Sequence, residues 1–566
     1  MRVKNRKENN PLKRLIIVLI ILALTAFILI KAQNYLKEQN VRKINLIINN
    51  NNVTERLKHD VKIKDGIIYV SMDDIQNFFD KYIYIEDEIN EVVTTYDKKI
   101  ASIGFEVKKL TLNGATKKIN ASAIKEDEEV YLPISEMTDV YNMELEHIEK
   151  NGIITIDSLN REQIKAYTKS KVSVKWKKDL LSKTVDKVAK GGIVIAISND
   201  EDGWTKVRTE KGKIGYIKTK KLTNFTTVRE EWIQDKQITG KVNLFWDYFS
   251  RYAQAPDRTG QKIEGVNVVS PSFFYIDKNG KMQEHVGKSG EAYIQWAHSN
   301  GYKVWPMLSS TEMLTGEEGR KVVSSILNSY TKRQELIEQI VVKCVEYGID
   351  GINVDFENMY QNDKDVYSRF IIELVPRMQE VGIVTSVDVT APDGDPNWSL
   401  CFDRNVIGDV ADYLVFMAYD QYGASSTKPG TTAGYNWVET SLKKIIEYDV
   451  VDTDKIILGI PLYTRIWTVS QDGTITGRST VDMVDINKLI PNEVDKQWDD
   501  TLKQYYVEFK SGKSTKKMWI EDGKSIAAKV SLVTKYNLGG TGCWEKDRET
   551  SNVWTIIREE LEKTSD

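Results

Sequence analysis

The sequence predicts several domains, of which the C-terminal one, residues 238–563, is an α/β barrel of the (β/α)8, or TIM, class with a small insertion. The 566 residues of the chain exceed what a single hydrophobic core can organise, because cores stop growing at about 250–300 residues. Within residues 238–563, apolar strand-like runs alternate with helical patterns, which is typical of parallel βα units.

Eight candidate strands support the barrel. They are residues 242–245, 266–269, 304–308, 349–354, 384–389, 413–418, 455–460 and 540–544. Eight parallel strands are the number that closes such a barrel, whose active site lies at the C-terminal ends of the strands. The stretch 464–529 is long for a loop and rich in aromatic residues, so we interpret it as an insertion plus the last helices, lining one wall of the cleft.

The N-terminus predicts a membrane anchor. A basic tail, residues 1–14, precedes an apolar run that begins at Leu15, ends at Ile30 and is followed by Lys31. About sixteen helical residues span roughly 24 Å, close to the hydrocarbon thickness of a bilayer. We expect a transmembrane helix over 15–32, with the tail in the cytoplasm and the rest outside the cell membrane. A cleaved signal peptide is the alternative, but a clear small-residue cleavage pattern is lacking.

Three segments connect the anchor to the barrel. Residues 33–55 are polar and rich in Asn, as expected of a stalk. Residues 56–158 contain a weak internal repeat, in which 65–72 is echoed by 128–135. This α/β segment resembles the N-terminal domain of copper amine oxidases. It implies no copper, because His, Cys and Met do not occur at ligand spacing.

Residues 164–223 resemble a bacterial SH3-like domain. Short strands alternate with polar turns and end in the sequences 202–209 and 212–217, which contain Gly203-Trp204 and Gly215-Tyr216. The resemblance implies a small all-β barrel of the kind that accompanies cell-wall enzymes. Whether Trp204 and Tyr216 fill its core or bind the wall is left open, with equal weight on each.

Composition excludes several function classes. Lys plus Arg (79) nearly balance Asp plus Glu (82), so nucleic acid is not an expected partner and a neutral polysaccharide fits better. The three Cys and four His show no metal-type spacing. We therefore expect no cofactor, no metal site and no disulfide scaffold.

A row of polar side chains follows the fourth predicted strand. Residues 350–357 read Asp-Gly-Ile-Asn-Val-Asp-Phe-Glu, and side chains alternate between the two faces of a strand. One face carries Gly351, Asn353, Asp355 and Glu357, and the other carries Ile352, Val354 and Phe356. The apolar set is expected to face the helices, which leaves two carboxylates and an amide in the barrel mouth, stepped about 6.6 Å per residue pair.

Two carboxylates in a confined site cannot both ionise freely, so one keeps a proton to higher pH. Holding a Glu protonated near neutrality requires a pKa shift of roughly two units, or about 2.7 kcal/mol. A strand-end pair that simply binds Lys or Arg is the alternative interpretation. The barrel context favours catalysis by Glu357 and Asp355.

These residues resemble the D-x-x-D-x-D-x-E motif of glycoside hydrolase family 18, the chitinase-like family. Asp350, Asp355 and Glu357 match the motif, whereas Asn353 stands where the family has a third Asp. The resemblance implies that Glu357 is the general acid and base and that Asp355 holds the substrate's 2-acetamido group, whose oxygen acts as nucleophile. Asn353 can hydrogen-bond to Asp355 but cannot share a proton with it. This Asn is similar to the family branch that acts on spore and cell-wall peptidoglycan.

Further positions match the family. Residues 417–420 read Met-Ala-Tyr-Asp, as in its M-x-Y-D motif. The resemblance implies that Tyr419 stabilises the cyclised intermediate and that Met417 and Asp420 shape the same subsite. Trp544 is similar to the Trp beneath the cleaved sugar. Two residues after the seventh strand, Tyr463 and Arg465, match substrate contacts.

The sequence thus predicts an extracytoplasmic hydrolase of β-1,4-linked N-acetylglucosamine glycans, with peptidoglycan as the preferred substrate because of the anchor and the SH3-like segment. A chitinase or an endo-β-N-acetylglucosaminidase is the enzymatic alternative. A non-catalytic glycan-binding wall protein is the alternative from another class, and Glu357 argues against it.

Overall fold

The computed structural model describes residues 44–126, 128–200, 202–231, 237–310, 312 and 315–563, together with Thr25 and Lys31. Two compact units divide the chain: residues 1–78 with 124–233, and residues 79–123 with 234–566. The predicted tail and anchor lie outside the described residues, apart from Thr25 and Lys31. Where the chain is described, its helices are too short or too polar to cross a membrane.

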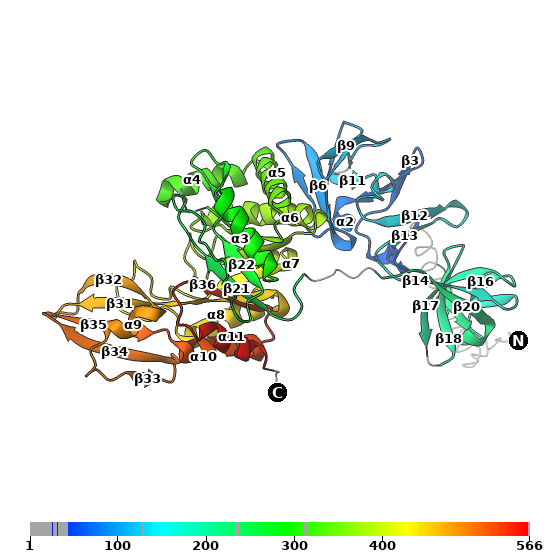
Figure 1. The fold of residues 1–566 in the computed structure, drawn as a ribbon. Helices are drawn as coiled ribbons and strands as arrows, with labels where there is room; N and C mark the ends of the chain where they lie inside the picture. The colour runs from blue at the N-terminus through cyan, green and yellow to red at the C-terminus, as the bar shows by residue number, and fades with distance from the viewer. Residues whose placement is uncertain are drawn as a thin grey trace, which may run out of the picture. The chain divides into compact units, whose positions relative to one another are not determined.

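A closed ring of parallel strands forms the centre of the second unit. In the described residues its strands are β21 (Val242–Asp247), β22 (Val268–Pro271), β25 (Lys303–Val304) with β26 (Met307–Ser309), β27 (Gly351–Asp355), β28 (Val384–Val389), β29 (Tyr413–Met417), β30 (Ile456–Pro461) and β36 (Gly540–Trp544). Figure 1 labels three of them, β21, β22 and β36, among the surrounding helices. β36 pairs in parallel with both β30 and β21, which closes the ring. The predicted TIM-type barrel is therefore confirmed.

The third strand of the barrel is interrupted. β25 pairs with β22 and β26 pairs with β27, so the two short pieces together bridge their neighbours. Pro306 lies between them and has no backbone N–H, and its carbonyl accepts from Asn353 N at 2.9 Å. The one strand predicted over 304–308 is thus two short pieces.

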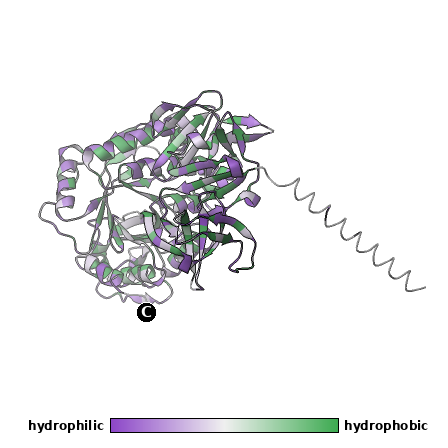
Figure 2. Cartoon of the chain, turned by 90° about the vertical axis from the view of Figure 1, so that its right-hand side faces the viewer, coloured by the Kyte–Doolittle hydropathy of each residue, from purple (hydrophilic) through white to green (hydrophobic). Residues whose placement is uncertain are grey.

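Helices pack around the ring through apolar faces. They are α3 (Gly287–Ser299), α4 (Gly316–Leu327), α5 (Tyr330–Tyr347), α6 (Lys364–Glu380), α7 (Arg404–Val410), α8 (Tyr435–Glu447), α10 (Gly523–Lys535) and α11 (Val553–Leu561). Figure 2 shows hydrophobic and hydrophilic residues alternating along helices, as expected where one face is buried. On α6, the rings of Tyr367 and Phe370 stack on Phe356 at 5.9 and 5.7 Å, so the residue before Glu357 is fixed from outside the barrel.

The insertion is an antiparallel sheet. Its strands are β31 (Tyr463–Val469), β32 (Ile475–Asp482), β33 (Gln497–Asp499), β34 (Gln504–Ser511) and β35 (Ser514–Ile520), with the short helix α9 (Ile486–Leu489). The strand order is β32-β31-β35-β34-β33. Trp467 of β31 donates through Nε1 to the carbonyl of Gly430 at 2.8 Å, which ties the insertion to the loop after β29.

A second antiparallel sheet belongs to the barrel unit although it precedes the barrel in sequence. It contains β5 (Tyr84–Glu86), β6 (Glu91–Tyr96), β7 (Lys99–Gly104), β8 (Lys109–Leu112) and β9 (Ala115–Lys118). The Tyr84 hydroxyl donates to Glu373 of α6 at 2.6 Å, and Arg333 of α5 bridges Glu86 and Glu373. The segment predicted as one domain, 56–158, is therefore divided between the two units.

The first unit begins with two small sheets and one helix. One sheet has the order β12-β13-β1-β2 and the other β10-β11-β4-β3. Their strands are β1 (Asn45–Ile48), β2 (Asn51–Asn52), β3 (Lys62–Lys64), β4 (Ile67–Ser71), β10 (Ile124–Glu126), β11 (Glu129–Leu132), β12 (Met143–Ile148) and β13 (Ile153–Ser158), and the helix is α2 (Met72–Phe78). β4 and β11, which carry the two copies of the weak repeat, pair with each other.

Residues 163–229 form a seven-stranded antiparallel sheet in the order β16-β15-β19-β18-β17-β14-β20. The strands are β14 (Gln163–Thr168), β15 (Val172–Lys175), β16 (Thr184–Val188), β17 (Ile193–Asp200), β18 (Trp204–Thr209), β19 (Ile214–Lys218) and β20 (Leu222–Arg229). Trp204 is buried, with Lys218 Nζ 4.2 Å from the centre of its ring. The resemblance to an SH3-like domain remains a prediction.

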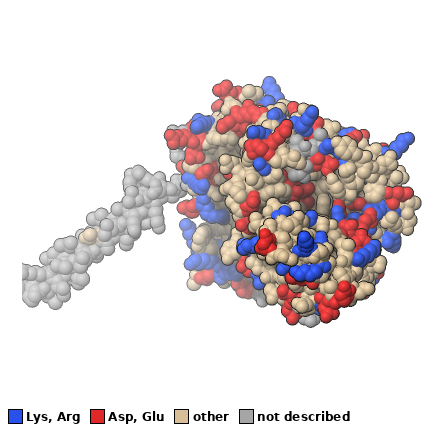
Figure 3. Space-filling model, turned by 90° about the vertical axis from the view of Figure 1, so that its left-hand side faces the viewer, with Lys and Arg blue, Asp and Glu red and all other residues tan. Residues whose placement is uncertain are grey.

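Surface charge is mixed. Figure 3 shows Lys and Arg interspersed with Asp and Glu over the visible face. Because opposite charges alternate at short range, their fields largely cancel beyond a Debye length.

Candidate active site

The predicted catalytic residues lie where β27 ends. Asp355 is the last residue of the strand, and Glu357 follows two positions later. Ile352, Val354 and Phe356 are fully buried in the core shared with the helices, so the alternation places the polar set on the barrel's inner face. Glu357 is half-buried and Asp355 is 7% exposed. Solvent therefore reaches the acid at the rim.

Asn353 occupies the centre of a buried hydrogen-bond network. Trp246 of β21 donates through Nε1 to Asn353 Oδ1 at 2.8 Å. Asn353 Nδ2 in turn donates to Asp388 Oδ1 at 2.7 Å and to Ser386 Oγ at 3.1 Å. The amide thus links three strands of the barrel below the carboxylates.

The carboxylates of this centre hold protons to unusually high pH. Burial raises the pKa of Asp355 to about 7. Burial, and then the charges of Asp355 and Asp420, raise the pKa of Glu357 well above its usual range. A protonated Glu357 at neutral pH is the form that a general acid needs.

Tyr419 lies two residues beyond the end of β29, and its ring packs against the barrel core. Burial, and then the nearby groups of Asp388, Tyr463 and Glu357, raise the pKa of its hydroxyl well above the usual range. The hydroxyl therefore stays protonated and can donate a hydrogen bond. The charges of Glu357 and Asp388 thus act on the Tyr419 hydroxyl.

Asp420 connects the barrel rim to the insertion. Its Oδ1 accepts from the Tyr463 hydroxyl at 2.7 Å and from Arg465 Nη2 at 2.8 Å. Asp420 is exposed whereas Tyr463 and Arg465 are buried. The two predicted substrate contacts on β31 thus face Asp420, and through it the rim.

Two further predicted residues line the same end of the barrel. Met417 is the last residue of β29 and is buried. Trp544 is the last residue of β36, is half-buried, and lies 5.8 Å from the ring of Trp246 and 6.1 Å from that of Tyr248. The peptide bond between Trp544 and Glu545 is cis. An indole exposed at the strand end offers an apolar face to a sugar ring.

Asp350 and Gly351 lie at the opposite end of β27 from the carboxylates. Asp350 accepts from Lys303 Nζ and His298 Nε2, both at 2.8 Å. Burial alone would raise the pKa of Asp350, but these partners hold it below the usual value. A Cβ on Gly351 would lie 2.3 Å from the Trp305 indole. Both residues therefore have structural roles and lie outside the catalytic centre.

Sequence reasoning missed several residues of the centre. Asp388 and Ser386 on β28 and Trp246 on β21 contact Asn353, and Ser310 Oγ accepts from Glu357 N at 3.1 Å. Ser386 and Asp388 alternate with apolar Val387 and Val389, which is the pattern used to interpret β27. The same signal was present in the predicted strand 384–389.

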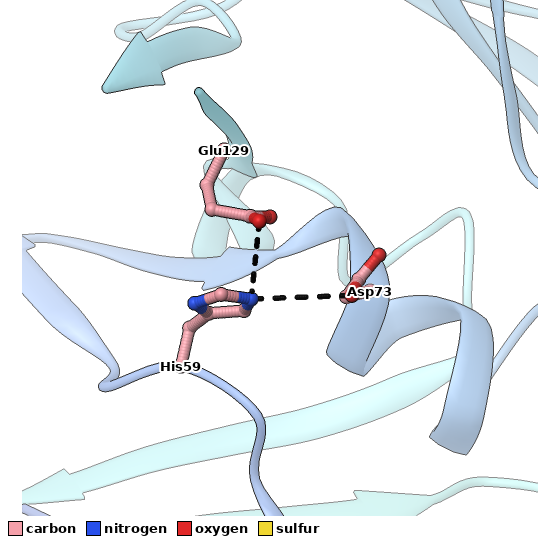
Figure 4. Close-up of side chains that lie close together, drawn as sticks. All are labelled: His59, Asp73 and Glu129. Carbon is pink, nitrogen blue, oxygen red and sulfur yellow. Dashed lines mark ion pairs between the residues drawn. The ribbon is translucent and has the colours of Figure 1, made fainter. Parts of the chain in front are cut away.

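The first unit contains a group that could hold a metal ion. Among the described residues, His59, Asp73 and Glu129 place one ligand atom each within 4.8 Å of one another (Figure 4). His59 Nε2 lies 3.3 Å from Glu129 and 3.9 Å from Asp73. Lys58 Nζ already binds the same Asp73 oxygen at 2.9 Å, so this carboxylate has a cationic partner without a metal ion. The prediction of no metal did not anticipate it.

Comparison with known proteins adds the family to this geometry. The pattern of Glycosyl hydrolases family 18 matches residues 241–549, more than half of the chain and all of the barrel strands. The chain belongs to glycosyl hydrolase family 18. It is therefore a glycosidase, and the prediction of an enzyme is confirmed.

Family relatives include proteins of Bacillus subtilis. The uncharacterized glycosylase YvbX is 26% identical over 297 residues, which cover 52% of this chain and 84% of that protein. The putative sporulation-specific glycosylase YdhD is 27% identical over 277 residues, covering 48% and 64%. A cortical fragment-lytic enzyme is 24% identical over 293 residues, covering 48% and 67%.

Solved structures of the family align as well. A chitinase from Chromobacterium violaceum is 23% identical with a TM-score of 0.49, covering 57% of this chain and all of the other. The spore cortex-lytic enzyme SleL from Bacillus megaterium is 21% identical with a TM-score of 0.47, covering 60% and 79%.

Proposed function

We propose that the barrel hydrolyses β-1,4-linked N-acetylglucosamine glycans, with peptidoglycan as the substrate, by substrate-assisted retaining catalysis. The observation that carries the proposal is the position of Glu357, Asp355 and Tyr419 at the strand ends, where the charge of Asp355 raises the pKa of Glu357 and both carboxylates raise the pKa of the Tyr419 hydroxyl. Glu357 is the general acid and then the general base.

The spacing of the carboxylates supports participation of the substrate. Asp355 and Glu357 lie two residues apart on one strand face, so both approach the glycosidic bond from the same side. Enzymes with a protein nucleophile place their two carboxylates on opposite sides of the bond. Here the 2-acetamido oxygen takes the second role, with Asp355 accepting the acetamide N–H.

Glu357 transfers its proton to the glycosidic oxygen, the C1–O bond breaks, and the acetamide oxygen bonds to C1 to form an oxazolinium ion. The Tyr419 hydroxyl donates to this acetamide oxygen. Water then attacks C1 and gives a proton to Glu357, and the acetamide–C1 bond breaks. Two displacements at C1 retain the anomeric configuration.

Peptidoglycan is favoured over chitin by the relatives. A cortical fragment-lytic enzyme of Bacillus subtilis matches 48% of this chain, and its name describes lysis of cortex fragments. A human di-N-acetylchitobiase also matches, at 21% identity, so a chitin-type substrate is the second candidate. Both share the 2-acetamido sugar that the mechanism requires.

The N-terminal sequence supports a location outside the cytoplasm. We propose that the apolar run 15–30, which follows a basic tail, tethers the chain to the membrane with the barrel on the outer side. Two measurements test this location. Separation of cell membranes should recover the chain in the membrane fraction. Protease treatment of intact cells whose wall has been removed should cleave off the barrel, and protection of the barrel would contradict the proposal.

The test of the activity is Glu357→Gln. The amide keeps the shape of the side chain but cannot transfer a proton, so hydrolysis of peptidoglycan and N-acetylglucosamine oligomers should fall by about 100- to 10,000-fold. Binding of the oligomers should persist. Glu559 is an exposed residue of α11. Glu559→Gln is therefore the matched control and should behave like the wild type.

Two results would contradict the proposal. Retained turnover in Glu357→Gln would exclude this residue as the acid, and an inverted product anomer, measured by NMR early in the reaction, would exclude the acetamide as nucleophile. A wild type that binds oligomers without any turnover would instead indicate a glycan-binding wall protein.

A further inference from the structure

Asp388 is a buried carboxylate that neither the sequence motif nor the proposed steps use. It lies on β28, is 2% exposed, and accepts from Asn353 Nδ2 at 2.7 Å. A carboxyl group inside a barrel carries a large desolvation penalty when it ionises. Its retention beside the catalytic strand therefore requires an explanation.

The orientation of Asn353 is fixed by its neighbours. The Trp246 indole is only a donor, so Asn353 must present its oxygen to Nε1 at 2.8 Å. Both amide hydrogens are then available to Ser386 Oγ and Asp388 Oδ1. Asn353 consequently has no free acceptor for a proton from Asp355, and an amide does not ionise.

One carboxylate oxygen of Asp355 lacks a hydrogen-bond donor among the described residues. This oxygen, Oδ1, is buried. Burial and the charge of Asp355 raise the pKa of Asp388 well above its usual range, although the Asn353 hydrogen bond opposes the rise. The two carboxyl groups therefore cannot both be charged at neutral pH without a large cost.

Other groups face Asp388 as well. Glu357 adds a smaller like-charge effect at the end of β27. The hydroxyls of Tyr367 on α6 and Tyr419 beyond β29 have pKa values raised by burial and by Asp388. Both hydroxyls stay neutral, so the titration of this centre belongs to its carboxyl groups.

We propose that Asp388 is a positioning residue that holds a proton for Asp355, and so supplies from the fifth strand the carboxylate that the family motif carries at the position of Asn353. The inference rests on the proposed function. When Asp355 ionises to accept the acetamide N–H, its proton passes to the Asp388 carboxylate, and it returns when the acetamide leaves. No proton is gained or lost over the cycle.

The decisive experiment compares Asp388→Asn with the exchange variant Asn353→Asp/Asp388→Asn. Asp388→Asn removes one of the two carboxyl groups that share the proton, and with it the like-charge repulsion that opposes loss of the last proton. The alkaline limb of the pH profile of kcat should therefore move to lower pH. kcat should fall roughly 10- to 100-fold, with KM changing less than about 3-fold. The exchange variant returns a carboxylate to the motif position and should recover most of the lost rate and the original limb.

Asp412→Asn is the matched control. This buried carboxylate accepts from Thr385 N at 2.8 Å and Gln379 Nε2 at 3.1 Å, beside the start of β29, and neither of these partners belongs to the catalytic centre. Asp412→Asn should leave the alkaline limb of the pH profile of kcat unchanged. Peptidoglycan and N-acetylglucosamine oligomers serve as substrates for every variant.

Three outcomes would overturn the inference. The pH profile of kcat for Asp388→Asn could keep the alkaline limb of the wild type, the exchange variant could fold without regaining activity, or both variants could fail to fold. The last would make Asp388 a structural residue. If the wild type shows no turnover, the proposed function is wrong. If the wild type is active but Asp388→Asn leaves the pH profile of kcat unchanged, only this inference is wrong.

Discussion

Asp420 Oδ1 lies 2.8 Å from Arg465 Nη2, so a carboxylate at the barrel rim is neutralised by a guanidinium on the insertion. Asp420 is also one of the charges that raise the pKa of Glu357. The insertion therefore acts on the acid through this ion pair, although it contributes no strand to the barrel.

Arg465→Met should change the pH dependence of activity. Without the guanidinium, the charge of Asp420 is no longer offset, so the pKa of Glu357 rises further and the alkaline limb moves to higher pH. Loss of the contact should also lower kcat/KM about tenfold through misplacement of Asp420. Arg478→Met, which removes a bond to the Ser426 carbonyl, is the control, and an equal shift in both variants would refute the ion-pair explanation.

Asp355→Asn should alter stability in a pH-dependent way. The pKa of Asp355 is about 7 in the folded protein and about 3.9 in an unfolded chain. The folded state therefore binds more protons between these values, and the wild type loses stability as pH rises from about 4 to about 7. The Asn variant lacks this loss, so its Tm relative to the wild type should increase with pH.

The control for this experiment is Asp257→Asn. A hydrogen bond from Thr259 lowers the pKa of this exposed carboxyl, so its contribution is present above about pH 4 and is lost in acid. Its Tm difference from the wild type should not increase with pH. A pH-independent difference for Asp355→Asn would contradict the assigned shift.

Arg333→Met should destabilise the barrel unit strongly. Arg333 is 3% exposed and Glu373 is fully buried, with Nε and Oε2 2.9 Å apart. Removing the cation leaves the buried Glu373 carboxylate without its ion-pair partner, at a cost of about 3–5 kcal/mol in the free energy of unfolding. Chemical denaturation measures the change.

Two further variants serve as controls for Arg333→Met. Arg333→Met/Glu373→Leu removes both charges and should recover most of the loss. Lys281→Met breaks an exposed pair with Glu335 and should change the free energy of unfolding by less than about 1 kcal/mol. A small effect in Arg333→Met would show that the sheet β5–β9 is not held by this pair.

Gly351→Ala should destabilise the start of β27. The new Cβ would lie 2.3 Å from Trp305 Cδ1, and Trp305 is fully buried. Its indole cannot move without disturbing the core, so a loss of about 1–3 kcal/mol is expected. Gly104→Ala on β7, where the nearest atom is 3.6 Å away, is the matched control, and equal denaturation midpoints would disprove the steric argument.

Much of the barrel was predictable from local pattern. The predicted strands 384–389 and 540–544 coincide with β28 and β36, because short strand-like segments between helical patterns mark the strands of βα units. The strand predicted over 304–308 was interrupted, since Pro306 cannot donate to the ladder. The grouping of residues 79–123 with the barrel depends on contacts with helices more than 200 residues away, which no local pattern reports.

The sequence by itself determined which residues face the barrel interior at the end of β27, because alternation along a strand is a local property of the backbone. Only the tertiary structure decided that Asn353 turns its oxygen to Trp246 and its amide hydrogens to Asp388, residues that lie 107 and 35 positions away. Strand register and ring closure bring these groups together, and the resulting burial is what shifts the protonation of the carboxyl groups.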